Sequence, residues 1–271
     1  MIQLRVTGPR GRALPTWGYL ALVAGYVLLV QVLGAVLTRD VDSAYASPTT
    51  VDALWRGISV PVGAGVVYVV VAVTVLRWWR PVVLDARPVR GWVVIVPVVM
   101  LGSIVLSTNY AGLADRGFTF SLLLLASALV VGFAEETLFR GIGVTAFRAN
   151  GFPEVRVALW TSLVFGLAHA SNLISTGPKA FAQVLVTAVA GYFFYLIRRR
   201  TGGLLAAVIV HGLWDFALIS STVVPGKSYF GLGVGLFAII ALTIIVYALR
   251  RDIEPLPPRP PDPAEHPRTR R

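Results

Sequence analysis

Residues 118–140 read FTFSLLLLASALVVGFAEETLFR, an apolar stretch that ends in two glutamates and an arginine. About 20 apolar residues in a helix cross the ~30 Å hydrocarbon core of a bilayer. Similar stretches recur along the 271-residue chain, which is 56% hydrophobic and only 14% charged. A soluble domain carries roughly 25% charged residues. The sequence therefore predicts a polytopic membrane protein.

Eight apolar segments predict an all-α bundle of about eight transmembrane helices. They cover residues 17–37, 58–76, 92–106, 118–139, 157–173, 180–197, 204–221 and 230–249. The first segment could be taken for a cleaved signal peptide, but its core of about 20 residues favours a retained helix. We expect a transmembrane domain over residues 1–253 and a disordered, proline-rich cytoplasmic tail over 254–271.

Basic residues predict the orientation of these segments. The termini and every second connection hold nineteen of the 24 Lys and Arg residues, with Arg140 assigned to the connection after residue 139. Lys and Arg are retained on the cytoplasmic side. We therefore expect both termini and the connections at Arg87 and Arg199 to be cytoplasmic in a bacterial plasma membrane, and Asp42 and Lys227 to face the exterior.

The charge and the cysteine content exclude several classes of function. The net charge of +11 would suit a nucleic-acid-binding protein, but the arginines lie between apolar segments, as in a membrane protein. The chain has no cysteine, which excludes disulfides, thiolate metal ligands and a cysteine nucleophile.

Five ionisable residues lie within the apolar segments, and all of them are in the second half of the chain. They are Glu135, Glu136, His169, His211 and Asp215. A charge at the bilayer centre costs at least ~2.5 kcal/mol on insertion scales, so each of these groups needs a partner, a water-filled cavity or a function.

Helix geometry separates the two glutamates, because residues four apart share a face and adjacent residues diverge. Glu136 can pair with Arg140, which leaves Glu135 free. By the same spacing, Asp215 can hold the imidazole of His211. Any one of these pairs could be purely structural, but the set of five predicts a chemical or ion-handling site in one cavity.

The order of these residues resembles the CAAX-protease and bacteriocin-processing (CPBP or ABI) family of intramembrane proteases. That family has an EExxxR segment, an FxxxH segment and a later HxxxN segment in which Asp also occurs. Here they read EETLFR at 135–140, FGLAH at 165–169 and HGLWD at 211–215. The resemblance covers about residues 121–220. It implies a helical bundle of about eight spans and hydrolysis of a peptide bond within the membrane.

The resemblance carries catalytic roles to six residues: Glu135, Glu136, Arg140, His169, His211 and Asp215. We expect Glu135 to be the general base and His169 to orient or activate the same water. His211 and Asp215 would polarise the scissile carbonyl. A carboxylate donates a hydrogen bond only when it is protonated, so Asp215 could instead fix the tautomer of His211.

The sequence leaves the use of a metal open. Two histidines and a glutamate match the ligand count of an open catalytic zinc site, and the family is commonly labelled a metalloprotease. His169 and His211 are the candidate ligands. No HExxH helix is present, however, and a metal-free mechanism based on glutamate is equally compatible with these residues.

Two other classes of function explain part of the pattern. A proton- or cation-coupled transporter would use the same intramembrane acids and imidazoles, but it would not explain the order of the three motifs. A non-catalytic scaffold or immunity protein could retain the fold. For the protease, the expected partners are the lipid bilayer and a membrane-associated protein or peptide substrate.

The depths of the two motifs constrain the helix ends. With the boundaries above, Glu135 lies ~6 Å from the inner end of its span and His169 ~18 Å into the next, at 1.5 Å per residue. The two side chains reach one level if the helix continues past Arg140 towards Phe147. The turn between the two helices would then fall within residues 148–156.

Overall fold

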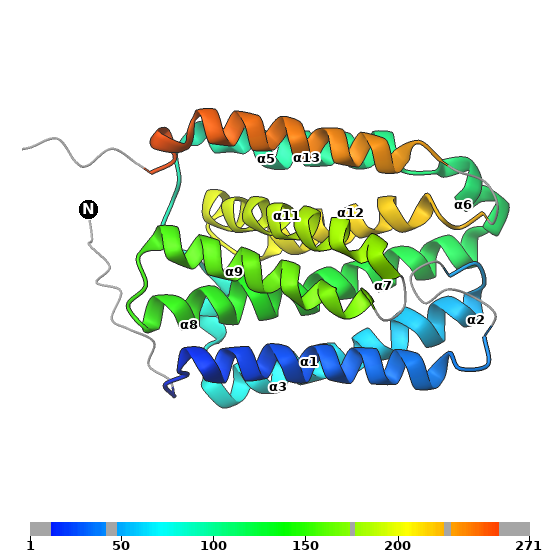
Figure 1. Ribbon diagram of the computed structural model, residues 1–271, viewed down its shortest axis with the longest axis horizontal. Coiled ribbons are helices and arrows are strands. Elements are labelled where there is room, and N and C mark those ends of the chain that lie inside the picture. The colour runs from blue at the N-terminus through cyan, green and yellow to red at the C-terminus, as the bar shows by residue number, and fades with distance from the viewer. Residues whose placement is uncertain (1–11, 42–47, 174–176, 225–228, 255–271) are drawn as a thin grey trace, which may run out of the picture.

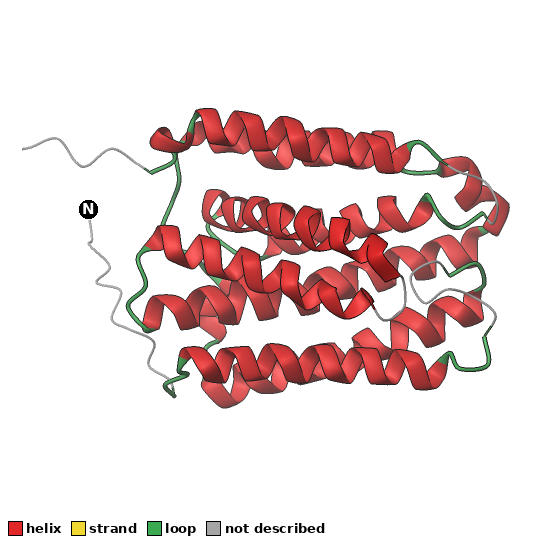
Figure 2. Cartoon of the chain, viewed as in Figure 1, coloured by secondary structure: helices red, strands yellow, loops and turns green. Residues whose placement is uncertain are grey.

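The computed structural model describes residues 12–41, 48–173, 177–224 and 229–254. Within this part of the chain the fold is all-α, as predicted, and the β-structure is one isolated bridge between Leu84 and Gly203 (Figure 2). The α-helices are α1 (Thr16–Leu37), α2 (Val51–Leu54), α3 (Val60–Leu76), α4 (Trp79–Val83), α5 (Ile95–Ser107), α6 (Tyr110–Arg116), α7 (Phe118–Glu136), α8 (Val144–Ala149), α9 (Glu154–Ala168), α11 (Ala180–Thr201), α12 (Leu205–Ser220) and α13 (Gly231–Ala248). Shorter turns of 3₁₀- or π-helix are η1 (Trp55–Ser59), η2 (Gly91–Val94), η3 (Thr137–Gly143), η4 (His169–Asn172), η5 (Gly177–Lys179) and η6 (Arg250–Asp252).

The long helices run side by side (Figure 1). The contacts pair α7 with α12, α9 with α11, α5 with α13, and α1 with α3. In Figure 1 the pair of α5 and α13 lies at one side of the bundle and the pair of α1 and α3 at the other. Helices α7, α9 and α12, which carry the three motifs, lie between them together with α11.

Among the described residues, five helical stretches are long and apolar enough to cross a membrane. The bent pair Gly91–Ser107 and Tyr110–Arg116 makes a sixth if it counts as one span. The five are Thr16–Leu37, Val51–Leu76, Phe118–Ala149, Ala180–Thr201 and Gly231–Ala248. Each of the eight predicted segments contains a helix, but α9 and α12 have only 15 and 16 residues. The chain is a multi-pass membrane protein, and the count of eight spans stays a prediction.

The predicted end of the fourth segment at residue 139 is wrong. Helix α7 continues through η3 into α8 and stops at Ala149, so Arg140 lies inside the helix and not in a connection. The turn follows at Asn150 and Gly151, where Gly151 has φ +80°. The depth argument, which required a helix past Arg140, is therefore confirmed.

Glycines set the contact between the motif-bearing helices. A Cβ atom at Gly132 of α7 would lie 2.6 Å from the carbonyl oxygen of Val208, and one at Gly212 of α12 would lie 2.7 Å from the Cα of Leu129. Small residues allow such close approach of membrane helices. The backbones of α7 and α12 thus meet where Glu136 and His211 face each other.

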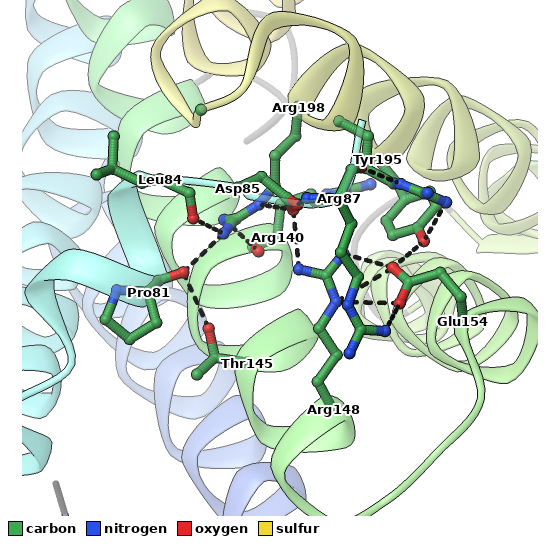
Figure 3. Close-up of polar contacts among 12 residues, drawn as sticks. Pro81, Leu84, Asp85, Arg87, Arg140, Thr145, Arg148, Glu154, Tyr195 and Arg198 are labelled. Carbon is green, nitrogen blue, oxygen red and sulfur yellow. Dashed lines mark hydrogen bonds and ion pairs between the residues drawn. The ribbon is translucent and has the colours of Figure 1, made fainter. Parts of the chain in front are cut away.

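One end of the bundle, the arginine-rich end, holds a network of ion pairs (Figure 3). The fully buried Arg198 of α11 donates to Asp85 at 3.0 Å. The same guanidinium donates to the backbone carbonyl oxygens of Pro81, Val82, Leu84 and Arg140. Arg148 pairs with both Asp85 and Glu154. The network ties α4, η3, α8, α9 and α11 together.

The carboxyl groups of this network have lowered pKa values. Burial opposes ionisation, but hydrogen bonds from Arg148 and Tyr195 lower the pKa of Glu154 from 4.5 to about 2. Burial also opposes the ionisation of Asp85, and the charges of Arg148 and Arg198 outweigh it, so the pKa of Asp85 is lowered.

The opposite end carries Arg56, which pairs with Asp40 and Asp52. The described members of the two predicted sets of basic residues thus lie at opposite ends, apart from Arg140 inside its helix. Arg5, Arg10, Asp42, Lys227 and the tail from residue 255 lie outside the described residues. Glu254, the first residue of the predicted tail, is paired with Arg199 at 2.7 Å.

Acid should loosen the arginine-rich end. A carboxyl group with a lowered pKa stabilises the fold above its unfolded pKa, and that contribution is lost as the pH falls from 4.5 towards 2. Glu154→Gln should lower the Tm at pH 7 by about 2–8 °C, or ~1–2 kcal/mol, and should make the Tm fall less between pH 5 and 3. Thermal unfolding in detergent checks this, and identical acid profiles for the two proteins would contradict it.

The orientation can be tested with single cysteines, because the chain has none of its own. Arg199 is a poor probe, since it is buried against Glu254. Arg156 and Asp115 are exposed and lie at opposite ends. An impermeant maleimide applied to intact cells should label Asp115→Cys and leave Arg156→Cys unlabelled until the cells are lysed. Labelling of Arg156→Cys in intact cells would reverse the orientation.

Candidate active site

The three motifs meet in the interior of the bundle. Glu135 and Glu136 end α7, and Arg140 lies one turn further in η3. His211 and Asp215 lie on α12, and His169 lies where α9 tightens into η4. The predicted site residues therefore come from three separate helices and reach one region.

Glu136 and Arg140 form the expected ion pair, with 2.9 Å between Oε1 and Nη1 and neither side chain exposed. Arg140 also donates to the carbonyl oxygen of Gly191 at 3.3 Å, and its guanidinium carbon lies 4.0 Å from the centroid of the Phe165 ring. A Cβ atom at Gly191 would lie 2.6 Å from Arg140 Nη2. The guanidinium therefore fills a space that only glycine leaves open.

Glu136 has a second partner that the sequence did not predict. Its Oε1 also lies 2.9 Å from Nδ1 of His211. The His211 ring stacks on Phe194, with centroids 4.6 Å apart and 16° between the planes. Because the carboxylate of Glu136 accepts at this distance, Nδ1 carries a proton and the tautomer of His211 is fixed by Glu136.

The other nitrogen of His211 faces the remaining two carboxyl groups. Its Nε2 lies 3.4 Å from Oδ2 of Asp215 and 3.9 Å from Oε2 of Glu135. The Asp215 side chain is 25% exposed and that of Glu135 is 17% exposed, whereas His211 is buried. Nε2 is thus the atom of His211 available to a bound molecule.

Glu135 is separate from the arginine, as predicted. Its Oε2 is buried and has no hydrogen-bond partner in the described part of the protein. Glu135 lies within electrostatic range of His169, His211 and Asp215. An unpartnered buried carboxylate oxygen is costly, at ~1–3 kcal/mol, unless a water or a substrate group fills the place.

Two contacts with Phe165 fix the position of the His169 ring. Its Nδ1 lies 2.9 Å from the carbonyl oxygen of Phe165, and the two rings pack edge to face with centroids 4.9 Å apart. A carbonyl oxygen only accepts hydrogen bonds, so Nδ1 is the donor and Nε2 is left as an acceptor. This state is suited to taking a hydrogen bond from a water.

A group of amide side chains lies beside His169, of which the sequence predicted only that Asn172 shares a face with His169. Gln31 of α1 donates to Oγ of Ser171 at 2.7 Å and to Oδ1 of Asn172 at 3.0 Å. Asn172 donates to Gln183 of α11 at 3.0 Å. Residues three apart in a 3₁₀-helix share a face, so Asn172 follows His169 on one side of η4. The signal in the sequence was a lone glutamine within an apolar segment.

The donor atoms do not form a metal-ligand set. No group of three or more His, Cys, Asp or Glu side chains within the described ranges is arranged to hold a metal ion. Oε1 of Glu136 contacts both Arg140 and His211, and Nδ1 of His169 faces a carbonyl oxygen. Nδ1 of each histidine thus faces an oxygen, as it also does in histidines that bind a metal through Nε2, and the use of zinc stays a prediction.

Comparisons with known proteins match the part of the chain that carries the three motifs. Residues 117–217 match a family model described as type II CAAX prenyl endopeptidase Rce1-like. An uncharacterized 24.3 kDa protein of Escherichia coli is 37% identical over 102 residues, which cover 36% of this chain and 43% of that protein. The alignment therefore spans less than half the length of this relative. The motif-bearing segment 117–217 matches the Rce1-like CAAX endopeptidase family, which confirms the predicted likeness to the CPBP proteases.

Proposed function

We propose that this protein is an intramembrane endopeptidase that hydrolyses a peptide bond of a membrane-associated protein or peptide. The observation that carries the proposal is the buried, unpartnered oxygen of Glu135 beside Nε2 of His211. Hydrolysis of an amide needs a base for water, a donor for the oxyanion and a proton for the leaving amine. The match to a CAAX endopeptidase family supports the same chemistry.

In the proposed reaction, a water binds between Glu135 and His169. Glu135 takes one proton from the water, and Nε2 of His169 accepts a hydrogen bond from it and orients it. The oxygen of the water bonds to the scissile carbonyl carbon. When the C–N bond breaks, Glu135 returns the proton to the leaving amine, and the new carboxyl group keeps the oxygen.

His211 is proposed to stabilise the oxyanion through an N–H at Nε2. Glu136 near Nδ1 and Asp215 near Nε2 lie on the two sides of the ring, so the doubly protonated form has a carboxylate for each N–H. A substrate oxygen would take the place beside Nε2. Asp215 then acts through His211, and Glu136 holds the N–H on the other side of the ring.

The transporter alternative is less well supported. Glu136 and Arg140 are fully buried and bonded to each other, which leaves them poorly placed to carry ions through the bundle. Glu135, whose Oε2 has no hydrogen-bond partner among the described residues, lies instead near two histidines. We further propose a plasma-membrane location with both termini in the cytoplasm, as the arginine-rich end and the positive-inside rule indicate.

Glu135→Gln should abolish cleavage and leave the fold intact, because it removes the base but preserves the volume. Loss of one acid–base group should lower the rate by ~10²–10⁴-fold. The measurement compares the protein termini of membranes from cells that express the wild type or the variant. Fragments that appear with the wild type and are absent with Glu135→Gln identify the substrates. Equal fragment patterns, with both proteins expressed at equal levels and folded in the membrane, would refute the role of Glu135.

Glu136→Gln is the matched control for this change, because it alters the adjacent residue in the same way. It removes the charged partner of Arg140, so it should reduce thermal stability in detergent by ~3–5 kcal/mol, as for other broken buried ion pairs. Glu135→Gln should leave the Tm unchanged within about 2 °C. If Glu135→Gln lowered the Tm and Glu136→Gln left it unchanged, the roles assigned to the two glutamates would have to be exchanged.

The proposed reaction uses no metal, so active enzyme purified without added metal should contain far less than one zinc per chain. A chelator should leave its activity within about twofold of the untreated enzyme. Elemental analysis of active protein measures the content directly. Stoichiometric zinc that is lost together with activity in both His169→Ala and His211→Ala would establish the metal mechanism instead.

A further inference from the structure

A shallow groove runs along the membrane surface of the bundle between α1 and α3, the pair at one side in Figure 1. Its α1 wall includes Trp17, Gly18 and Ala21, and its α3 wall includes Tyr68, Ala72 and Leu76. The hydroxyl of Tyr68 is already bonded to a backbone carbonyl oxygen. The groove is therefore apolar, and small residues on both helices create its depth.

The groove ends at a pair of arginines. The backbone N–H of Arg12 donates to the carbonyl oxygen of Leu76, so residue 12 lies at the end of the groove, and Arg77 follows Leu76 directly. Both arginines are exposed. Neither takes part in an ion pair within the described residues, whereas Arg148, Arg198 and Arg199 at the same end are paired with acids.

No acidic residue competes for these arginines from the two helices. Residues 12–37 and 60–84 contain no Asp or Glu. The groove is apolar, the exposed Trp17 lies near its end, and two unpaired cations follow. These features are complementary to a molecule with an acyl chain and an anionic head. Tryptophan and arginine are also the residues that occupy the headgroup level of membranes.

Arginine is an unusual residue at position 77, because the backbone there has a positive φ. Arg77 caps α3 in the left-handed conformation with φ +59°, and among the described residues it is the non-glycine residue with positive φ. Glycine or asparagine is the usual choice for such a cap. Backbone geometry therefore does not account for an arginine here, whereas a cation at the end of the groove does.

A second apolar groove provides a contrast. It lies between α11 and α13 and is lined by residues such as Leu185, Val189, Leu236 and Ile240. No arginine lies within four residues of any position that lines it. This groove suits acyl chains of any lipid, whereas the groove between α1 and α3 adds a site for a negative headgroup.

We propose that the groove between α1 and α3 binds an anionic phospholipid, with one acyl chain along the trough and the phosphate between Arg12 and Arg77. Such a lipid contacts both helices and so holds α1 against α3. Both helices lie outside the segment 117–217 that matches the protease family. The proposal is independent of the catalytic activity and stands if the protein cleaves nothing.

The test uses the full chain, purified in dodecyl maltoside, with dioleoylphosphatidylglycerol or dioleoylphosphatidylcholine added in equal amounts. Native mass spectrometry measures bound lipid, and thermal unfolding measures the stabilisation that a bound ligand confers. We expect one phosphatidylglycerol to bind at least tenfold more tightly than phosphatidylcholine and to raise the Tm. Inorganic phosphate alone should not raise it, because the acyl chain supplies part of the binding.

The double variant Arg12→Gln/Arg77→Gln should weaken binding of phosphatidylglycerol by about tenfold. The matched control is Arg156→Gln/Arg251→Gln, which removes the same charge from two exposed, unpaired arginines at the same end. Equal losses in the two double variants would show that net charge alone attracts the lipid and would overturn the site. Equal binding of the two lipids to the wild type, or a Tm shift with phosphate alone, would also overturn it.

Ala21→Trp tests the trough without changing charge. The larger side chain should remove the tightly bound phosphatidylglycerol while the chain still elutes as a monodisperse peak. Unchanged phosphatidylglycerol binding in a folded Ala21→Trp protein would place the lipid elsewhere. This variant also decides the question if the double arginine variant fails to fold.

Discussion

A single carboxylate oxygen, Oε1 of Glu136, receives hydrogen bonds from two helices at once. Arg140 reaches it from one turn further along the same helix, and His211 reaches it from α12, each at 2.9 Å. A buried ion pair is stable only when its hydrogen bonds are satisfied and its geometry is held. The surrounding structure holds the geometry, because glycines bring the helices close and aromatic rings cover the guanidinium and the imidazole. Oε2 of Glu136 and Nη2 of Arg140 have no hydrogen-bond partner among the described residues.

This arrangement places the adjacent side chains of Glu135 and Glu136 in different surroundings. Oε1 of Glu136 is bonded to Arg140 and His211, whereas Oε2 of Glu135 lies 3.9 Å from Nε2 of His211 and has no hydrogen-bond partner among the described residues. Glu136 is fully buried, whereas the Glu135 side chain is 17% exposed. The difference arises from the ~100° between successive residues of a helix, which directs one carboxylate to Arg140 and the other to the histidines.

The sequence predicted the features that depend on the residues of a single helix. Hydropathy located the eight segments, and i,i+4 spacing located the Glu136–Arg140 pair. The contact of Glu136 with His211 could not be predicted, because it depends on how far α12 slides along α7, which Gly132 and Gly212 determine in three dimensions. Gln31 was missed for a similar reason. A polar residue in an apolar helix has many possible partners, and only packing shows that Ser171 and Asn172 are the ones it meets.

The π-helical turn η3 changes the side of the long helix on which the following residues lie. A π-type turn adds about one residue, so the residues after it are rotated by roughly 100° relative to an uninterrupted α-helix. The part before the turn presents Glu135 and Glu136 to the histidines, and the part after it buries Phe147 against Tyr19 of α1. Without the extra residue these two faces could not both be directed inward. Deletion of one residue between 137 and 143 would therefore keep the chain helical and apolar, but would turn either the acids or the aromatic contact towards lipid.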